Sequence, residues 1–436
     1  MTYLAGVLVF VVVLLLSIGL HEIGHMVPAK RFGVRVSQYM VGFGPTLWSR
    51  TKGETEYGLK AIPLGGYVRL VGMYAPDEAV GSPPADTWYR RLARDARRAS
   101  AEEIHPGEDA RAFYHLSTPK KVTVMLGGPV MNLVIAFVLL GIVAVGFGTP
   151  TNTPTVSTVS QCVIPADAAP DRECLPTDPA APGAAAGLLP GDTVVSYDGV
   201  AITSWNQLTT AIRATGDDPT PIVVERDGTR VALTVTPVVA QRPVVDKNGL
   251  PVKDAAGNPK TAAVGFLGIS PTEVMERRSP LAVPGIVADT TWQTISVVGT
   301  LPGRVVDLAQ TTFSNEERDA NSLVGVVGIG RFAGEIASAD DVTEGIKASS
   351  LLTILAVLNI SLFVFNLIPL PPLDGGHVAA ALWEGAHRQV ARVRGRARPG
   401  PSDSAKLVPI AYAVFVVLGA VGLLLVYADL FNPIVI

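Results

Sequence analysis

The sequence predicts an α-helical polytopic membrane protein with four transmembrane helices, a small membrane-associated β-sheet and an inserted extracytoplasmic α+β domain. The first observation is composition: 48% of the 436 residues are hydrophobic and only 17% are charged, against about a quarter in soluble domains. The second is that the apolar residues gather in four long runs, and the third is that strand and turn patterns lie between them. The net charge of −3 gives no overall positive potential that would attract nucleic acid, so we expect no nucleic-acid partner.

Four segments are apolar over lengths that suit a transmembrane helix, which needs about 20 residues. The predicted spans cover residues 1–30, 122–147, 351–384 and 407–428. The first lacks the basic start and the small-x-small cleavage site of a signal peptide, so we interpret it as a span. The lipid bilayer is therefore an expected partner of the chain.

Lys and Arg near the span ends predict the orientation, because loops rich in these residues stay in the cytoplasm. Basic pairs stand at 30–31 and 120–121, and five arginines follow the third span. The twenty residues after Phe147 contain neither Lys nor Arg. We therefore expect segments 30–121 and 385–406 on the cytoplasmic side and segment 148–350 outside.

The segments between the spans differ in pattern. Residues 33–71 alternate strand-forming side chains with Gly-rich breaks, which predicts a small antiparallel sheet on the cytoplasmic side. Residues 72–118 are rich in Pro, Ala and charged residues, which predicts a mobile cytoplasmic loop with its arginines on a solvated surface. Residues 239–350 are predicted as an extracytoplasmic loop with amphipathic segments, and 385–406 as a basic cytoplasmic loop.

Residues 154–238 show short strands, tight turns and one amphipathic helix, as in a separate domain. The run Ala184-Ala-Ala-Gly-Leu-Leu-Pro-Gly-Asp resembles part of a PDZ domain of the bacterial protease type, which implies a groove for peptide tails or regulators. Cys162 and Cys174 fall on the oxidising side, so we predict a disulfide between them. Two free thiols that sense redox state or bind a metal are the alternative.

The strongest chemical signal is His21-Glu22-Ile-Gly-His25 at the end of the first span. On a helix, residues four apart project from one face, so both imidazoles can reach one metal ion. Glu22 lies beside them and can take a proton from an attacking water. Ionisable groups at the end of an apolar span are costly and by default functional. These residues predict a hydrolytic zinc centre with Glu22 as its base.

Two histidines leave a tetrahedral zinc one protein ligand short. The third span offers Asp374 within Asn366-Leu-Ile-Pro-Leu-Pro-Pro-Leu-Asp374-Gly-Gly-His377. At about 1.5 Å of helix per residue, His21 and Asp374 both fall near the cytoplasmic side of the bilayer core. We therefore predict zinc ligands at His21, His25 and Asp374, with His377 in a capping or supporting role.

These motifs together resemble the bacterial site-2 proteases of the RseP type, which are intramembrane zinc metalloproteases with a PDZ domain. Four motifs carry the resemblance in family order: HEIGH, GFGP with IPLGGYV, GGPVMN, and NLIPLPPLDGG. The resemblance implies hydrolysis of a peptide bond in or near the transmembrane segment of single-pass proteins of the bacterial cytoplasmic membrane. Pre-trimmed anti-sigma factors and signal-peptide remnants are the implied substrate classes.

The same resemblance implies that the substrate pairs with an exposed edge of the 33–71 sheet and that Asn366 contacts it. Tyr67, an aromatic residue of the predicted sheet, is a second candidate for substrate contact. The family often has another Asn five residues before Asn366, where this chain has Ser361, and Asn359 stands two residues earlier, so neither is given a role. We interpret Asn132 of GGPVMN as a packing residue and expect the PDZ segment to act as a size gate.

Two other function classes compete with a protease. A non-catalytic adaptor would bind peptide tails through the PDZ segment, and a transporter would use the buried charges for ions. The intact HEIGH motif with a matching Asp374 disfavours the adaptor. No internal repeat of the spans is visible, which disfavours the transporter.

Overall fold

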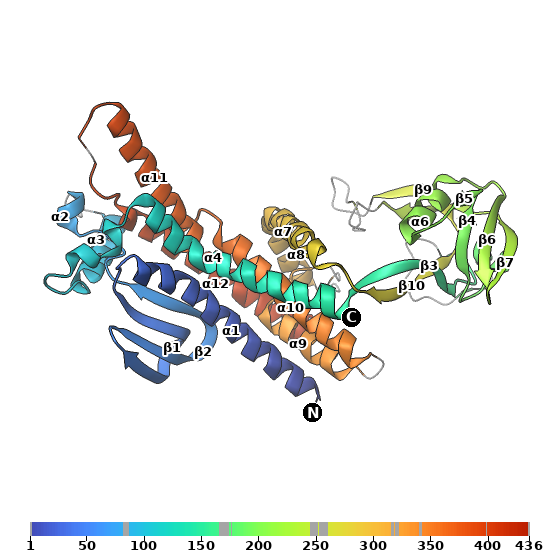
Figure 1. Cartoon of the computed structure of the whole chain (residues 1–436), viewed down its shortest axis with the longest axis horizontal. Helices are drawn as coiled ribbons and strands as arrows, with labels where there is room; N and C mark the ends of the chain where they lie inside the picture. Colours follow the sequence, from blue (N-terminus) through green and yellow to red (C-terminus); the bar gives the residue numbers. More distant parts are fainter. Residues whose placement is uncertain are drawn as a thin grey trace. The chain divides into compact units, whose positions relative to one another are not determined.

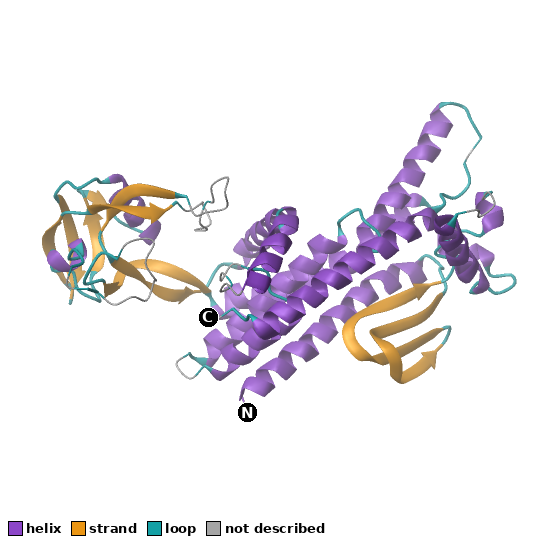
Figure 2. Ribbon diagram, turned by 180° about the vertical axis from the view of Figure 1, so that it is seen from behind, coloured by secondary structure: helices purple, strands orange, loops and turns teal. Residues whose placement is uncertain are grey.

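The computed structural model describes residues 2–81, 87–164, 174–175, 177–244, 252, 260–314, 318, 322–339, 342–397 and 399–434. The chain divides into two compact units, one formed by Met1–Phe147 with Arg278–Ile436 and the other by Gly148–Arg277. The first unit holds the long apolar helices, and the second is the inserted domain, which consists mainly of strands (Figures 1 and 2).

Four helices in the described part of the chain are long and apolar enough to cross a membrane, which confirms the predicted polytopic fold. They are α1 (Thr2–Arg31), α4 (Thr118–Gly141, continued by a π-helical turn over Ile142–Phe147), α10 (Glu344–Asn366) and α12 (Val408–Phe431). Helix α4 packs against both α1 and α10, so it lies between the two helices whose ends carry the predicted motifs (Figure 1).

The third predicted span, 351–384, is not one helix. Helix α10 ends at Asn366, and a second helix, α11, runs from Asp374 to Val393, so the predicted loop 385–406 also begins as a helix. Three prolines stand between α10 and α11, and proline supplies no N–H and disfavours helix in the residue before it. The break places Asp374 at the first position of α11.

The predicted sheet at 33–71 is formed by β1 (Val36–Lys52) and β2 (Thr55–Leu70), which pair antiparallel (Figure 2). Both strands bend, and Gln38–Val41 pairs with 56–59 on one side and with 66–69 on the other. Glycines at the bends adopt positive φ values, 94° at Gly42 and 106° at Gly65, which side chains rarely tolerate. The segment Gly66–Leu70 therefore forms one outer edge of the sheet.

The predicted loop 72–118 contains helical structure: α2 (Asp77–Val80), α3 (Trp88–Glu102) and two short 3-10 turns at Asp109–Arg111 and Phe113–His115. The arginine run of α3 is not wholly a solvated surface, because the side chain of Arg97 is only 6% exposed and pairs with Asp77 and Asp403. Arg97 thus links residues 72–118 to Asp403, which is about three hundred residues later, and composition alone does not reveal such a partner.

The inserted unit has a sheet in the order β10-β3-β4-β6-β7, with a short β5 beside β4, and this topology is consistent with a PDZ domain. The strands are β3 (Thr149–Val159), β4 (Thr193–Tyr197), β5 (Val200–Ala201), β6 (Thr220–Arg226), β7 (Thr229–Val235) and β10 (Ile269–Glu276). Two helices, α5 (Pro182–Ala185) and α6 (Trp205–Ala214), and a hairpin of β8 (Val238–Pro243) with β9 (Thr261–Phe266) complete it.

The inserted unit extends beyond the predicted range of 154–238, because its edge strand β10 pairs with β3, which lies more than a hundred residues earlier. Cys162 and Cys174 form the predicted disulfide. After this unit come α7 (Val283–Gly299), α8 (Leu301–Ser314) and α9 (Val326–Ser338), where amphipathic segments are predicted. Helix α9 packs against α1 in the first unit.

The inserted unit offers a pH-dependent test of stability. Asp192 is 1% exposed and accepts hydrogen bonds from the Leu189 N–H and from Nε and Nη2 of Arg226, at 2.9, 2.7 and 2.8 Å. The Arg226 guanidinium holds the pKa of this carboxyl below its ordinary value. Arg226→Gln should therefore destabilise the unit at neutral pH, because Asp192 loses a charged hydrogen-bond donor.

A carboxyl whose pKa is lowered by folding stabilises above its unfolded pKa and loses that stability as pH falls through the folded pKa. The difference between wild type and Arg226→Gln should therefore persist from neutral pH down to about pH 4, near the unfolded pKa of an aspartate, and shrink below it, as calorimetry of the full-length protein would measure. Arg230→Gln, at an exposed position of the adjacent strand, should show little difference at any pH. A gap for Arg226→Gln that stays constant with pH would contradict this account.

Candidate active site

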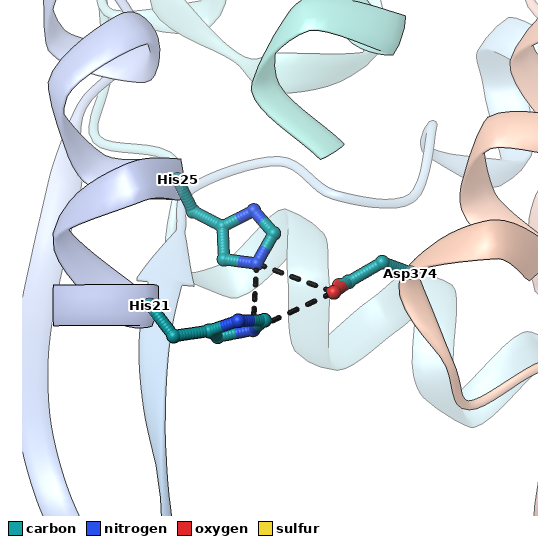
Figure 3. A group of neighbouring side chains, drawn as sticks. All are labelled: His21, His25 and Asp374. Carbon is teal, nitrogen blue, oxygen red and sulfur yellow. Dashed lines mark hydrogen bonds and ion pairs between the residues drawn. The ribbon is translucent and has the colours of Figure 1, made fainter. Parts of the chain in front are cut away.

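Three potential metal ligands from two distant helices meet near one end of α1. Helix α1 presents His21 and His25 from the same face, four residues apart, and α11 presents Asp374 opposite them (Figure 3). Nε2 of His21 and Nε2 of His25 are 3.2 Å apart, and both lie close to Oδ2 of Asp374, at 3.5 and 3.4 Å. The three residues predicted as ligands thus come together.

This triangle fits a tetrahedral zinc ion. Zinc bonds of about 2.0–2.1 Å to nitrogen and oxygen place any two ligands of a tetrahedron about 3.3–3.4 Å apart. The three observed separations agree with one face of such a tetrahedron. A fourth position is left for a non-protein ligand, as in catalytic rather than structural zinc sites.

Asp374 is positioned by a tight turn before α11. The two glycines that follow it lie so close to the backbone of 367–371 that a Cβ at Gly375 or Gly376 would overlap main-chain atoms there, with Leu370 C only 2.8 Å from the latter. The Asp-Gly-Gly sequence therefore serves a packing purpose: it lets the chain fold back closely enough to bring the carboxylate of Asp374 to the histidines.

Two backbone glycines of α4 make room for the metal ligands. The α1 and α4 backbones touch where Gly24 meets Gly127 and Gly128, and a Cβ built on Gly24 would lie 3.0 Å from the Gly128 Cα. A Cβ on Gly128 would overlap Nε2 of His25 and would lie 2.7 Å from Nε2 of His21. The space that the histidine rings occupy thus explains Gly128 of the GGPVMN motif, and the close approach of the Gly24 backbone explains Gly127.

Helix α4 also orients both imidazoles. Nδ1 of His25 donates to the Val124 carbonyl oxygen at 2.8 Å, which leaves Nε2 free for a metal. Nδ1 of His21 lies 3.0 Å from the side-chain amide of Asn132, which is fully buried. The atom that faces Nδ1 is the amide nitrogen Nδ2, and the buried oxygen Oδ1 has no hydrogen-bond partner among the described residues. With the amide turned over, Oδ1 accepts the proton that Nδ1 carries when His21 binds metal through Nε2. The interpretation of Asn132 as mere packing was therefore incomplete, since a lone Asn in a span gives no signal of its partner.

We expect Asn132→Leu to lower zinc affinity by about 10–100-fold, because His21 loses the acceptor that fixes its ring and tautomer. Asn132→Asp keeps an acceptor and should retain most of the affinity. Chelator competition on the purified variants measures the change. Asn359→Leu is the matched control, since Asn359 is equally buried but bonds to Ser17 and Leu355. Equal zinc affinity in wild type and Asn132→Leu would contradict the orienting role.

Glu22 lies next to the ligand group, as predicted. Its side chain is buried, with the residue 8% exposed, and it lies against Gly66 of the sheet edge. A cavity of about 300 Å³ opens beside it and is lined by the three ligands, Glu22 and the edge segment 66–70. The structure therefore places a carboxylate at the same cavity as the ligand triangle.

The other predicted site residues divide into two groups. Asn366, Tyr67 and His377 line the cavity, and the Tyr67 hydroxyl donates to the side-chain oxygen of Gln38 at 3.3 Å. Asn359 and Ser361 do not line it: the former bonds to Ser17 of α1, and the latter donates to the Val357 carbonyl.

The comparison with known proteins decides the family. The model of peptidase family M50 matches residues 9–398. This chain belongs to peptidase family M50. Over its whole length the M50 chain is 34% identical to the zinc metalloprotease Rip1 of Mycobacterium tuberculosis (strain H37Rv), of which 99% is covered.

Other relatives agree. The M50 chain is 34% identical to Rip1 of Mycolicibacterium smegmatis, with 98% of each protein aligned. It is 28% identical to the metalloprotease MmpA of Caulobacter vibrioides, with 87% of this chain and 86% of that protein aligned. The M50 chain is thus a zinc metalloprotease of the site-2 type. This finding argues against the two competing function classes, a non-catalytic adaptor and a transporter.

Proposed function

We propose that this protein hydrolyses a peptide bond in or near the transmembrane segment of single-pass membrane proteins, with zinc held by His21, His25 and Asp374. The observation that carries the proposal is the ligand triangle of 3.2, 3.4 and 3.5 Å at the end of an apolar helix. Zinc bound there would polarise the scissile carbonyl and lower the pKa of the attacking water. Glu22 takes the proton of that water and passes it to the leaving amine.

The substrate is proposed to enter as an extended strand beside Gly66–Leu70. A transmembrane helix hides its peptide groups, so it must unwind before cleavage, and a free sheet edge offers backbone partners to the unwound chain. The edge segment lines the same cavity as the ligands, and Asn366 lines it from the end of α10. We assign Asn366 and Tyr67 to substrate contact on this placement.

A proline substitution in the other half of β2, at Tyr57, would not test this edge. Tyr57 lies opposite both Tyr39 and Arg50, so it is inside the sheet, and proline there would disrupt two ladders at once. Cross-linking avoids that problem. Both native cysteines are in the disulfide, so one introduced cysteine supplies a single free thiol.

With Glu22→Gln as the non-cleaving background, Tyr67→Cys should form a disulfide with a cysteine placed near the cleavage site of a bound substrate. Arg50→Cys, on the opposite outer segment of the sheet, is the matched control and should cross-link several-fold less, because it is remote from the cavity lining. Gel shift under non-reducing conditions gives the yield. Equal yields at the two positions would overturn the edge assignment.

The orientation and the substrate classes follow from charge and family. The basic residues at 30–31, 120–121 and 388–396 support a cytoplasmic placement of the metal site, with the inserted domain outside. The enzyme is proposed to act in the bacterial cytoplasmic membrane on chains already shortened outside, such as trimmed anti-sigma factors or signal-peptide remnants. The inserted domain is proposed to select for that shortening and to bind peptide tails or regulators.

The direct test is cleavage of a trimmed single-pass protein by the purified enzyme in proteoliposomes. We expect about one zinc per chain, loss of cleavage on chelation and recovery on adding zinc back. Asp374→Asn should lose most of its zinc, because one of three protein ligands is weakened. Full zinc content and full cleavage in Asp374→Asn would refute the ligand assignment. A zinc-loaded wild type that cuts no trimmed single-pass protein would refute the substrate class.

A further inference from the structure

A cavity lined by arginines lies where α11 crosses the start of α4. Gly385 of α11 sits against Thr118, the first residue of α4, so closely that a Cβ on the glycine would lie 2.8 Å from the threonine methyl. The cavity has a volume of about 690 Å³. Its lining residues are Ser117, Thr118, Pro119, Gly385, Arg388, Gln389, Arg392 and Arg396. We call it the arginine groove.

The groove carries more positive charge than its surroundings neutralise. Lys121 and Arg388 share one carboxylate, that of Glu384, at 2.9 and 2.7 Å, and Glu384 is 5% exposed. Arg392 and Arg396 are exposed and have no ion pair among the described residues. The groove lining thus contains three arginines, of which only Arg388 has an ion pair among the described residues, and the excess positive charge suits an anionic ligand.

An apolar face of α11 adjoins the groove. Leu382, Trp383, Val390 and Val393 are 55%, 68%, 44% and 77% exposed, and at 100° per residue they share one side of the helix. The groove residues Gln389 and Arg392 fall between this face and the side that packs on α4, and Arg396 follows shortly after the end of the helix. A ligand seated in the groove would therefore have apolar side chains directly beside its charged end.

The position of the groove indicates the source of such a ligand. Helix α4 spans the membrane and begins at Thr118, so the groove lies at a membrane–water boundary, and α11 has the cationic strip and exposed Trp and Leu of an interfacial helix. We propose that the arginine groove binds the headgroup of an anionic phospholipid, whose acyl chains lie along Leu382, Trp383 and Val390. Free inorganic phosphate would use the arginines but not the apolar face.

Native mass spectrometry of the full-length Glu22→Gln protein tests this without any substrate turnover. Phosphatidylglycerol should remain bound where phosphatidylcholine does not, and Arg392→Gln/Arg396→Gln should weaken phosphatidylglycerol binding by about tenfold or more. Arg90→Gln/Arg394→Gln removes the same charge from exposed positions outside the groove lining and should bind as the parent does. Zinc content should be unchanged in both pairs.

A second measurement, of tryptophan fluorescence, tests whether the acyl chains of the lipid lie beside Trp383. Phosphatidylglycerol with brominated chains should quench fluorescence more in the parent than in Trp383→Phe, and the Arg392→Gln/Arg396→Gln pair should reduce that difference. Equal loss of binding in the two arginine pairs would show general electrostatics and overturn the site. Displacement of the lipid by millimolar inorganic phosphate would show a phosphate site and also overturn it.

Discussion

Glu22→Gln is expected to keep its zinc and to lose turnover by at least about 100-fold. The substitution preserves size and removes the base, and general-base catalysis contributes about 10²–10⁴-fold in rate. Zinc should stay because the ligand triangle is formed by His21, His25 and Asp374 without Glu22. Metal analysis of the purified variant and cleavage of a trimmed single-pass protein in proteoliposomes provide the two measurements.

Glu344→Gln is the matched control for that variant, since the side chain of Glu344 is 90% exposed and pairs with Lys347 one helical turn away. It should retain wild-type zinc content and wild-type cleavage. Loss of zinc from Glu22→Gln would instead make Glu22 a ligand. Retained turnover would assign the base to another group at the cavity.

Gly128→Ala should empty the metal site and reduce cleavage by at least about 100-fold, since at least one ligand must move. By helix propensity alone the change would stabilise α4 by about 1 kcal/mol. The added methyl, however, would overlap Nε2 of His25 and press on His21, and the hydrogen bonds of these rings to Val124 and Asn132 of the same helix keep them from moving away freely. Steric conflict at the ligands should therefore outweigh the gain in propensity.

Gly141→Ala separates the two effects, because a Cβ there meets only Val283 Cγ1 at an ordinary 3.8 Å. This control in the same helix should keep both zinc and activity. Zinc stoichiometry by atomic absorption and cleavage rate should be measured together on both variants. Full zinc loading in Gly128→Ala would mean that α1 and α4 can separate without cost to the site.

The chemistry was more predictable from the sequence than the packing around it. That His21, His25 and Asp374 come together could be predicted because residue type, helical spacing and depth along a span are each visible within a single segment. The role of Asn132 and the reason for Gly128 depend on which face of α4 meets α1, and the periodicity of one helix does not specify its neighbour. A local sequence pattern predicts that a residue lies in a helix, but it does not predict which other helix packs against that residue.

Longer-range pairing explains the other differences. Strand β10 completes the sheet of the inserted unit by pairing with β3, so the unit's boundary is not visible in the strand and turn pattern of 154–238. Arg97 looks like a surface charge until Asp403, three hundred residues later, is placed beside it. The prolines before α11 did carry a local signal, but it shows only that helix is disfavoured there and not where the second helix starts.

The separation of the ligands along the chain has a consequence for biosynthesis. Two of the three donors are made within the first twenty-five residues, and the third arrives only at residue 374. A ribosome must therefore translate the whole inserted unit, and the membrane must accept α10, before a three-ligand centre can exist. Any chain released early lacks the carboxylate and should hold metal poorly. Fragments that end before residue 374 should therefore not become active proteases in the membrane.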